Sequence, residues 1–159
     1  MKKYILSTFV IATLALSLSS CFEQPNLSYN GPTVVEFDAA VNTAPAAGRT
    51  FPLIATTNGA GQLTPRINLV GPQRATESQV RIGIDAAAST AVEGTHYRIL
   101  NNKTVTIPAQ NSFGTATIEI LRVPAQANTT VVLVLLLEGN GTDILPSENF
   151  KRIGYSIRL

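Results

Sequence analysis

The single histidine and the single cysteine of this chain limit the chemistry that it can perform. A serine or cysteine hydrolase needs a nucleophile, a base and an orienting acid within hydrogen-bond reach, and zinc sites draw on several His or Cys ligands. His96 stands beside Gly94 and Tyr97, where a strand is expected to begin. An imidazole at such a corner more often binds backbone groups than a substrate. We therefore interpret His96 as structural and predict that the protein is not an enzyme of these classes.

The ten aspartate and glutamate residues are spread along the chain. Hydrolysis of a glycosidic bond needs two carboxyl groups that flank one sugar. No clustered pair in a loop suggests such a site, so we expect no catalytic residues and no cofactor.

Calcium binding is an alternative that the sequence does not exclude. The segment 92–97, with the sequence VEGTHY, is similar to a corner of the calcium-exchanger β-motif, whose sandwiches bind Ca²⁺ through acidic loops. Asp38, Asp85 and Glu93 are weak calcium candidates, with Asp143 as a further oxygen donor. Calcium takes roughly six to eight oxygen ligands, and no DxDxD-like run supplies them here. We expect no metal site and keep calcium as a lesser alternative.

Cys21 points to covalent acylation. Before it stand two basic residues, an apolar stretch over residues 4–16 and small residues up to Ser20. This order predicts a cleaved export signal over residues 1–20, and the apolar stretch is shorter than the roughly 20 residues that a transmembrane helix needs. The motif Leu18-Ser19-Ser20-Cys21 resembles the bacterial lipobox. The resemblance implies cleavage between Ser20 and Cys21 and a diacylglycerol on the Cys21 thiol, so that fatty chains such as palmitate hold the protein at a membrane.

The charges that remain after this cleavage are balanced. Ten of the 12 Lys and Arg residues and all ten Asp and Glu residues follow residue 20. The arginines are scattered singly, whereas a nucleic-acid partner requires a basic patch that neutralises phosphates. We therefore expect no nucleic-acid binding.

The sequence predicts β-strands after residue 32. Residues 21–32 contain Pro and Gly without periodicity and are interpreted as a flexible tether. Side chains then alternate over residues 33–38, 66–70, 79–85, 103–109, 114–120 and 152–159, with turn signals between them. Residues 39–49 are interpreted as a loop and residues 57–61 as a tight turn. Residues 51–55 are interpreted as a weaker strand, and Pro52 places it at a sheet edge or places the proline at the start of the strand.

The run over residues 131–137 is apolar at every position. β-Branched residues dominate its start and no helix caps flank it, so it predicts a central strand, with a buried helix as the lesser reading. Burying these strands requires a single domain over residues 33–159. We expect an all-β, immunoglobulin-like antiparallel β-sandwich of seven to nine strands, without the Cys and Trp core of true immunoglobulin domains.

Two short motifs resemble a known family. The order EGTHY (residues 93–97), then VTIPA (residues 105–109), then an alternating strand is similar to the immunoglobulin-like domains of unknown function in Bacteroidetes lipoproteins, which are encoded near starch-utilisation-type glycan uptake systems. The family usually has Gly after Pro-Ala, where this chain has Gln110. The resemblance implies a β-sandwich on an outer-membrane lipid anchor, at the cell surface or on the periplasmic face.

The family's genomic neighbourhood suggests glycan binding. Sugars are commonly held by exposed aromatic rings, and Tyr29, Phe113 and Phe150 are the loop aromatics that could contact one, unless they are ordinary core and loop residues. We expect a non-enzymatic, lipid-anchored binding or accessory scaffold module in a glycan or nutrient uptake assembly, with outer-membrane importer components or polysaccharide as partners. The alternative is a direct glycan-binding surface module.

Overall fold

The computed structural model describes residues 29–159, of which residues 31–159 form one compact unit. The predicted signal peptide, Ser20 and Cys21 lie outside the described residues. In the described part, twelve strands and two short helices follow one another as β1 (Val34–Phe37), α2 (Asp38–Asn42), β2 (Leu53–Thr57), β3 (Gly61–Leu63), β4 (Arg66–Val70), β5 (Ser78–Ile84), β6 (Tyr97–Ile99), η2 (Asn101–Lys103), β7 (Thr104–Ile107), β8 (Phe113–Thr115), β9 (Ile118–Ile120), β10 (Thr130–Gly139), β11 (Leu145–Pro146) and β12 (Arg152–Arg158).

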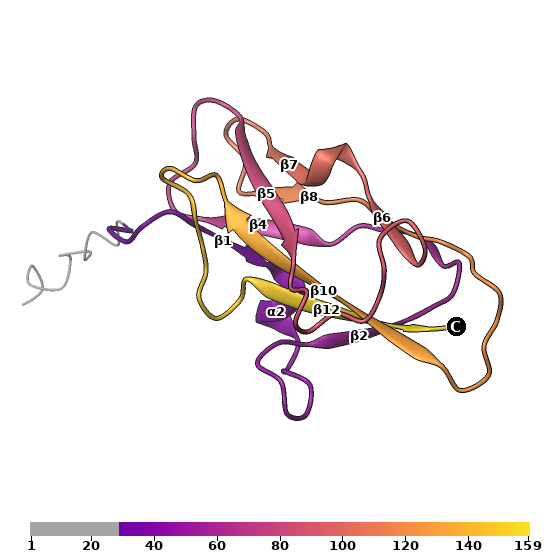
Figure 1. Ribbon diagram of the computed structural model, residues 1–159. Coiled ribbons are helices and arrows are strands. Elements are labelled where there is room, and N and C mark those ends of the chain that lie inside the picture. Colours follow the sequence, from indigo (N-terminus) through magenta and orange to yellow (C-terminus); the bar gives the residue numbers. More distant parts are fainter. Residues whose placement is uncertain (1–28) are drawn as a thin grey trace, which may run out of the picture. The chain divides into compact units, whose positions relative to one another are not determined.

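These strands form the predicted all-β sandwich. One sheet has the order β2-β12-β10-β5-β7, the second has the order β11-β1-β4-β8, and a third small sheet has the order β3-β9-β6. Strands β10 and β12 of the first sheet contact β1 of the second, as Figure 1 shows. The residues at the centre are apolar and fully buried, among them Phe37, Ile67, Ile82, Ile107, Leu133, Leu135, Ile153 and Ile157.

The third sheet continues the second. Gly61 in β3 pairs with Ile120 in β9, and five residues further on Arg66 in β4 pairs with Thr115 in β8, five residues before Ile120. The register is therefore unbroken across the gap between the two sheets. Pro65 lies in this gap and accepts a hydrogen bond from the Ala116 N–H, but it has no N–H to donate in return, so the ladder is interrupted there. This interruption splits the strand predicted over residues 114–120 into β8 and β9.

Strand β10 is central, as its apolar run predicts. It pairs with β12 on one side and with β5 on the other, both antiparallel. The side chain of Val134 lies on the face of β10 opposite to Leu133 and Leu135, yet all three are fully buried. Both faces of the strand are therefore covered at this point.

Four details differ from the sequence expectations. Residues 38–42 form the helix α2, where a strand end at Asp38 and a loop from residue 39 were expected, because two alanines favour a helical turn and Ala40 packs into the core. Residues 145–146, which were not among the predicted strands, form β11. The sheets are mixed, since β11 runs parallel to β1 and β2 runs parallel to β12. The number of strands exceeds the expected seven to nine for two reasons. The interruption at Pro65 divides two long strands into β3 with β4 and β8 with β9, and the short strands β6 and β11 add to the number.

Two local predictions are confirmed. Strand β2 lies at the edge of its sheet, directly after Pro52. Residues 57–60 form a turn in which the Ala60 N–H bonds the Thr57 carbonyl and Gly59 has a φ of 66°. Among the described residues, no helix has the length and apolar character required to cross a membrane.

Candidate functional site

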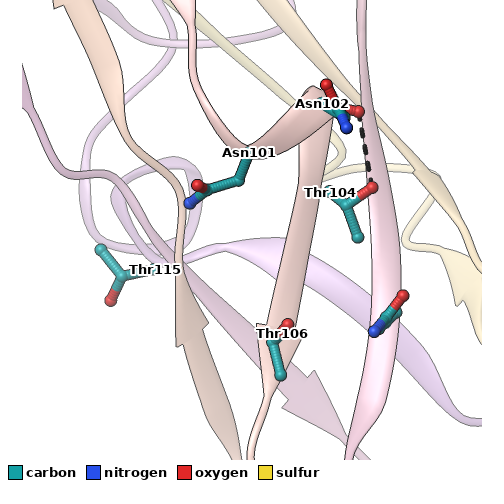
Figure 2. Close-up of a pocket in the computed structure, with 6 residues that line it drawn as sticks. Asn101, Asn102, Thr104, Thr106 and Thr115 are labelled. Atoms are coloured by element: carbon teal, nitrogen blue, oxygen red, sulfur yellow. Dashed lines mark hydrogen bonds between the residues drawn. The ribbon is translucent and has the colours of Figure 1, made fainter.

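A polar hollow of about 420 Å³ lies where β5, β7 and β8 meet. We call it the neutral hollow, and Figure 2 shows its side chains around the short helix η2 and along β7. Each of them is uncharged and carries hydrogen-bonding groups: Gln79, Asn101, Asn102, Thr104, Thr106 and Thr115.

The alternation of side chains along β5 and β7 places part of this lining on the solvent-exposed face. Gln79 in β5 is the direct antiparallel partner of Thr106 in β7, so their side chains lie on the same face. Val80 and Val105 next to them are buried. The apolar residues therefore fix the register, and the polar residues between them face the solvent.

Thr115 comes from the other sheet. Strand β8 can approach β7 because its central residue is Gly114: a Cβ there would lie 2.6 Å from the Thr106 carbonyl oxygen and 2.9 Å from Cγ1 of Val105. Because Gly114 has no side chain, β8 and β7 can lie in contact where the two sheets meet. The neutral hollow is thus built on both layers of the sandwich.

The backbone of η2 is strained. Asn101, Asn102 and Lys103 have φ values of 55°, 50° and 60°, in the left-handed region that costs a non-glycine residue roughly 1–2 kcal/mol. Asn tolerates this region best, and the Lys103 ammonium is tied to Oε2 of Glu93 at 2.8 Å. Such strain is commonly found at functional sites, and here it carries two amide side chains to the hollow.

The aromatic residue beside the neutral hollow is Phe113. It lies two residues before Thr115 on the same face of β8, about 7 Å away along the strand, and it is 40% exposed. The Arg66 guanidinium carbon lies 4.0 Å from its ring centroid, while Arg66 Nε donates to Oδ1 of Asn68. This stacking fixes the ring next to the hollow.

The other two predicted aromatic contacts lie elsewhere. Phe150 is partly buried, packs against the core and lines a different hollow. Tyr29 is 46% exposed at the start of the described residues. The structure therefore does not bring Phe113 and Phe150 to one site.

The three calcium candidates are kept apart by their partners. Oδ1 of Asp38 accepts from Nδ2 of Asn68 at 3.1 Å, Oδ2 of Asp85 pairs with Arg152 at 3.1 Å, and Glu93 pairs with Lys103. In the described part of the chain, no three His, Cys, Asp or Glu residues come close enough to share a metal ion. Each of the three carboxylates thus has a side-chain partner of its own, at a separate place in the fold.

His96 has the structural role that its position suggests. Its Nδ1 accepts a hydrogen bond from the Val92 N–H at 2.9 Å, and its carbonyl accepts one from the Leu121 N–H. The imidazole closes the EGTHY corner through the backbone.

The shifted pKa values lie outside the neutral hollow. Burial raises the pKa of Tyr155 to about 12. Burial, and secondly the nearby Glu93 carboxylate, raises the pKa of Tyr97. The six lining side chains do not titrate near neutral pH. The arrangement can bind a neutral, hydroxylated ligand, and it offers no group for proton transfer.

The lining residues of the neutral hollow were not among the site residues predicted from the sequence. The alternation in the sequence already places the side chains of Gln79, Thr104 and Thr106 on the outer face of their strands. Three polar, uncharged residues on adjoining strands could therefore have indicated a polar surface site. The approach of Thr115 and the left-handed turn at residues 101–103 depend on the folded chain.

No family model and no curated protein matches this chain. Among solved structures, it is similar to the apo form of the Calx CBD1 domain, with a TM-score of 0.58 and 12% identity over 80% of this chain and 97% of that one. The fold is shared. A Bacteroides ovatus protein of unknown function gives a TM-score of 0.54 and 9% identity, over 80% of this chain and 52% of that one.

A "putative carbohydrate binding protein" from Bacteroides ovatus gives a TM-score of 0.52 and 8% identity, over 78% of this chain and 36% of that one. At these identities the likeness establishes a β-sandwich that also occurs in Bacteroides proteins. It transfers no ligand.

Proposed function

We propose that this protein is a lipid-anchored, non-enzymatic binding module of the cell envelope, and that its neutral hollow takes a neutral glycan. The observation that carries the proposal is the lining of the hollow, six uncharged side chains that are matched to sugar hydroxyls. The exposed ring of Phe113 next to it can cover the apolar face of a sugar. The occurrence of this fold in Bacteroides proteins supports a role in a glycan or nutrient uptake assembly.

The glycan part is tested by affinity electrophoresis against a panel of neutral polysaccharides. We expect retardation by at least one of them, and T106V should weaken that binding about two- to tenfold, the range for one neutral hydrogen bond. The matched control is T57V, because Thr57 is also an exposed threonine on a strand but lies at the other edge of the sheet. Migration unaffected by every polysaccharide would contradict glycan binding.

The anchor rests on the motif Leu18-Ser19-Ser20-Cys21. We expect the wild-type protein to incorporate labelled palmitate and to sediment with outer membranes, and C21A to do neither. A C21A protein that stays labelled and membrane-bound would disprove acylation at this thiol.

An accessory scaffold role is the second candidate, and the free edge of β2 favours it. The Gly154 N–H bonds the Pro52 carbonyl and the Asn58 N–H bonds the Arg158 carbonyl, so even-numbered residues of β2 face β12. The backbone of Ala55 therefore faces away from the sheet, where a partner's strand could pair. Loss of cross-linking to outer-membrane importer components in A55P, with polysaccharide binding unchanged, would support this role over direct glycan binding.

A further inference from the structure

A second hollow, of about 520 Å³, lies between the loop that follows α2 and the loop that precedes β12. Both loops can be followed in Figure 1, in indigo to purple and in yellow. We call it the loop hollow. Its lining differs from that of the neutral hollow because it includes charged side chains and an aromatic ring. Besides Pro45, the lining residues are Arg49, Thr50, Glu148, Asn149, Phe150 and Arg152.

Two guanidinium groups flank one buried ring at this place. The guanidinium carbons of Arg49 and Arg152 lie 5.5 Å and 5.1 Å from the centroid of Phe51, which is 5% exposed. Arg152 is neutralised: its Nη1 lies 3.1 Å from Oδ2 of Asp85, and its Nη2 donates to Oγ1 of Thr50 at 2.7 Å.

Glu148 is neutralised as well, by Lys151 at 2.9 Å. Arg49 is different. Within the described residues its guanidinium forms no ion pair and lies over the Phe51 ring. The loop hollow therefore keeps one uncompensated positive charge. A guanidinium binds a carboxylate through two parallel N–H donors, which makes that anion its natural partner.

The remaining lining fits a sugar that carries such a carboxylate. Thr50 accepts from Arg152 and keeps its own hydroxyl proton to donate, and the exposed Asn149 offers both an amide donor and an acceptor. Phe150 supplies an aromatic wall that is half-buried and held by its backbone, since its carbonyl accepts from the Phe37 N–H at 3.0 Å.

We propose that the loop hollow binds the uronic acid residue of an acidic polysaccharide, with the Arg49 guanidinium on its carboxylate. This site is independent of the neutral hollow, which involves β5, β7 and β8, whereas the loop hollow lies at the start of β2 and β12 at the other edge of the five-stranded sheet.

The experiment compares polygalacturonate oligomers with the same oligomers after methyl esterification, by calorimetric titration of the full chain carrying C21A. We expect binding of the acid form, at least about tenfold weaker binding of the ester, and at least about tenfold weaker binding of the acid form to R49Q, the size of a lost charge-assisted hydrogen bond. R122Q is the matched control, because Arg122 is exposed, forms no ion pair in the described part, and lies beside Gly59 at the far end of β2.

Any of three affinity results would overturn the proposal: equal affinity for acid and ester, unchanged affinity in R49Q that unfolds like wild type, or an equal loss in R122Q, which would indicate diffuse charge attraction. A competition result would overturn it as well. Displacement of the oligomer by acetate as effectively as by galacturonate would show that a carboxylate alone is recognised, and would exclude the saccharide. T106V should leave this binding unchanged, so failure here is distinguishable from failure of neutral glycan binding.

Discussion

Asp143 connects two surface loops through one carboxylate. It accepts hydrogen bonds from Nδ2 of Asn140 at 2.8 Å and from the Thr142 hydroxyl at 3.1 Å, and it pairs with Arg74 at 2.7 Å. The hydrogen bond from Asn140, followed by that from Arg74, lowers the pKa of Asp143 to about 2. The charged form is therefore favoured in the folded state.

This shift gives a pH dependence with a defined sign. A carboxylate whose pKa is lowered by folding stabilises the protein above its ordinary pKa of 3.8, and this contribution is lost as the pH falls towards about 2. We expect D143N to lower the urea midpoint near neutral pH and to match wild type at the acid end. E77Q, at an exposed glutamate without an ion pair in the described part, should leave the neutral midpoint unchanged. A D143N deficit that persists at the acid end would contradict the assignment.

Gln110 occupies the position where the resembling family usually has glycine. Its φ is 55°, which a side chain disfavours, and its N–H donates to the Arg74 carbonyl at 2.7 Å. The chain thus keeps the turn geometry that glycine would favour.

We predict that Q110G stabilises the protein by roughly 0.5–1 kcal/mol, since relief of the left-handed strain outweighs the added freedom of the unfolded chain. The measurement is the free energy of unfolding in urea. Q126G is the control: Gln126 is exposed with an ordinary φ, so glycine there should be neutral or destabilising. Equal effects of the two substitutions would exclude strain at Gln110.

At the scale of elements, the seam between β7 and β8 depends on Gly114. A methyl group there would meet backbone at 2.6 Å, and the carbonyl of Thr106 cannot move without disturbing β7. We predict that G114A destabilises the protein by about 1–3 kcal/mol and weakens neutral glycan binding, because the hollow spans this seam.

G83A provides the comparison. A methyl group at Gly83 would meet the end of the Glu138 side chain, which is half-exposed and can rotate away. Its cost should be well below that of G114A in the same urea experiment. A larger loss in G83A would mean that the two sheets do not meet as described.

At the scale of the whole molecule, β12 is an interior strand of the five-stranded sheet. It pairs with β10 and β2 and buries Ile153, Tyr155 and Ile157. We predict that a chain lacking residues 153–159 shows no cooperative unfolding transition by circular dichroism, because the five-stranded sheet would be divided.

A chain that begins at residue 31 is the complementary truncation. Residues 31–159 form one compact unit, so this chain should unfold cooperatively. Cooperative unfolding of the C-terminal truncation would contradict the interior position of β12.

The sequence by itself predicted the all-β class, the central position of residues 131–137 and a structural role for His96, and it limited Pro52 to a sheet edge or a strand start. These follow from a side-chain period of two, from an apolar run and from Pro52, which are local properties of the chain.

Only the tertiary structure decided where side chains meet. Thr115 and Thr106 line one hollow because the two sheets close at Gly114. Within the described residues Arg49 has no carboxylate partner, since Asp85 pairs with Arg152 and Glu148 pairs with Lys151. The parallel edge pairs and the turn at residues 101–103 also lie beyond sequence periodicity. Such features depend on contacts between residues far apart in the chain, and the alternation within one strand does not specify its neighbour.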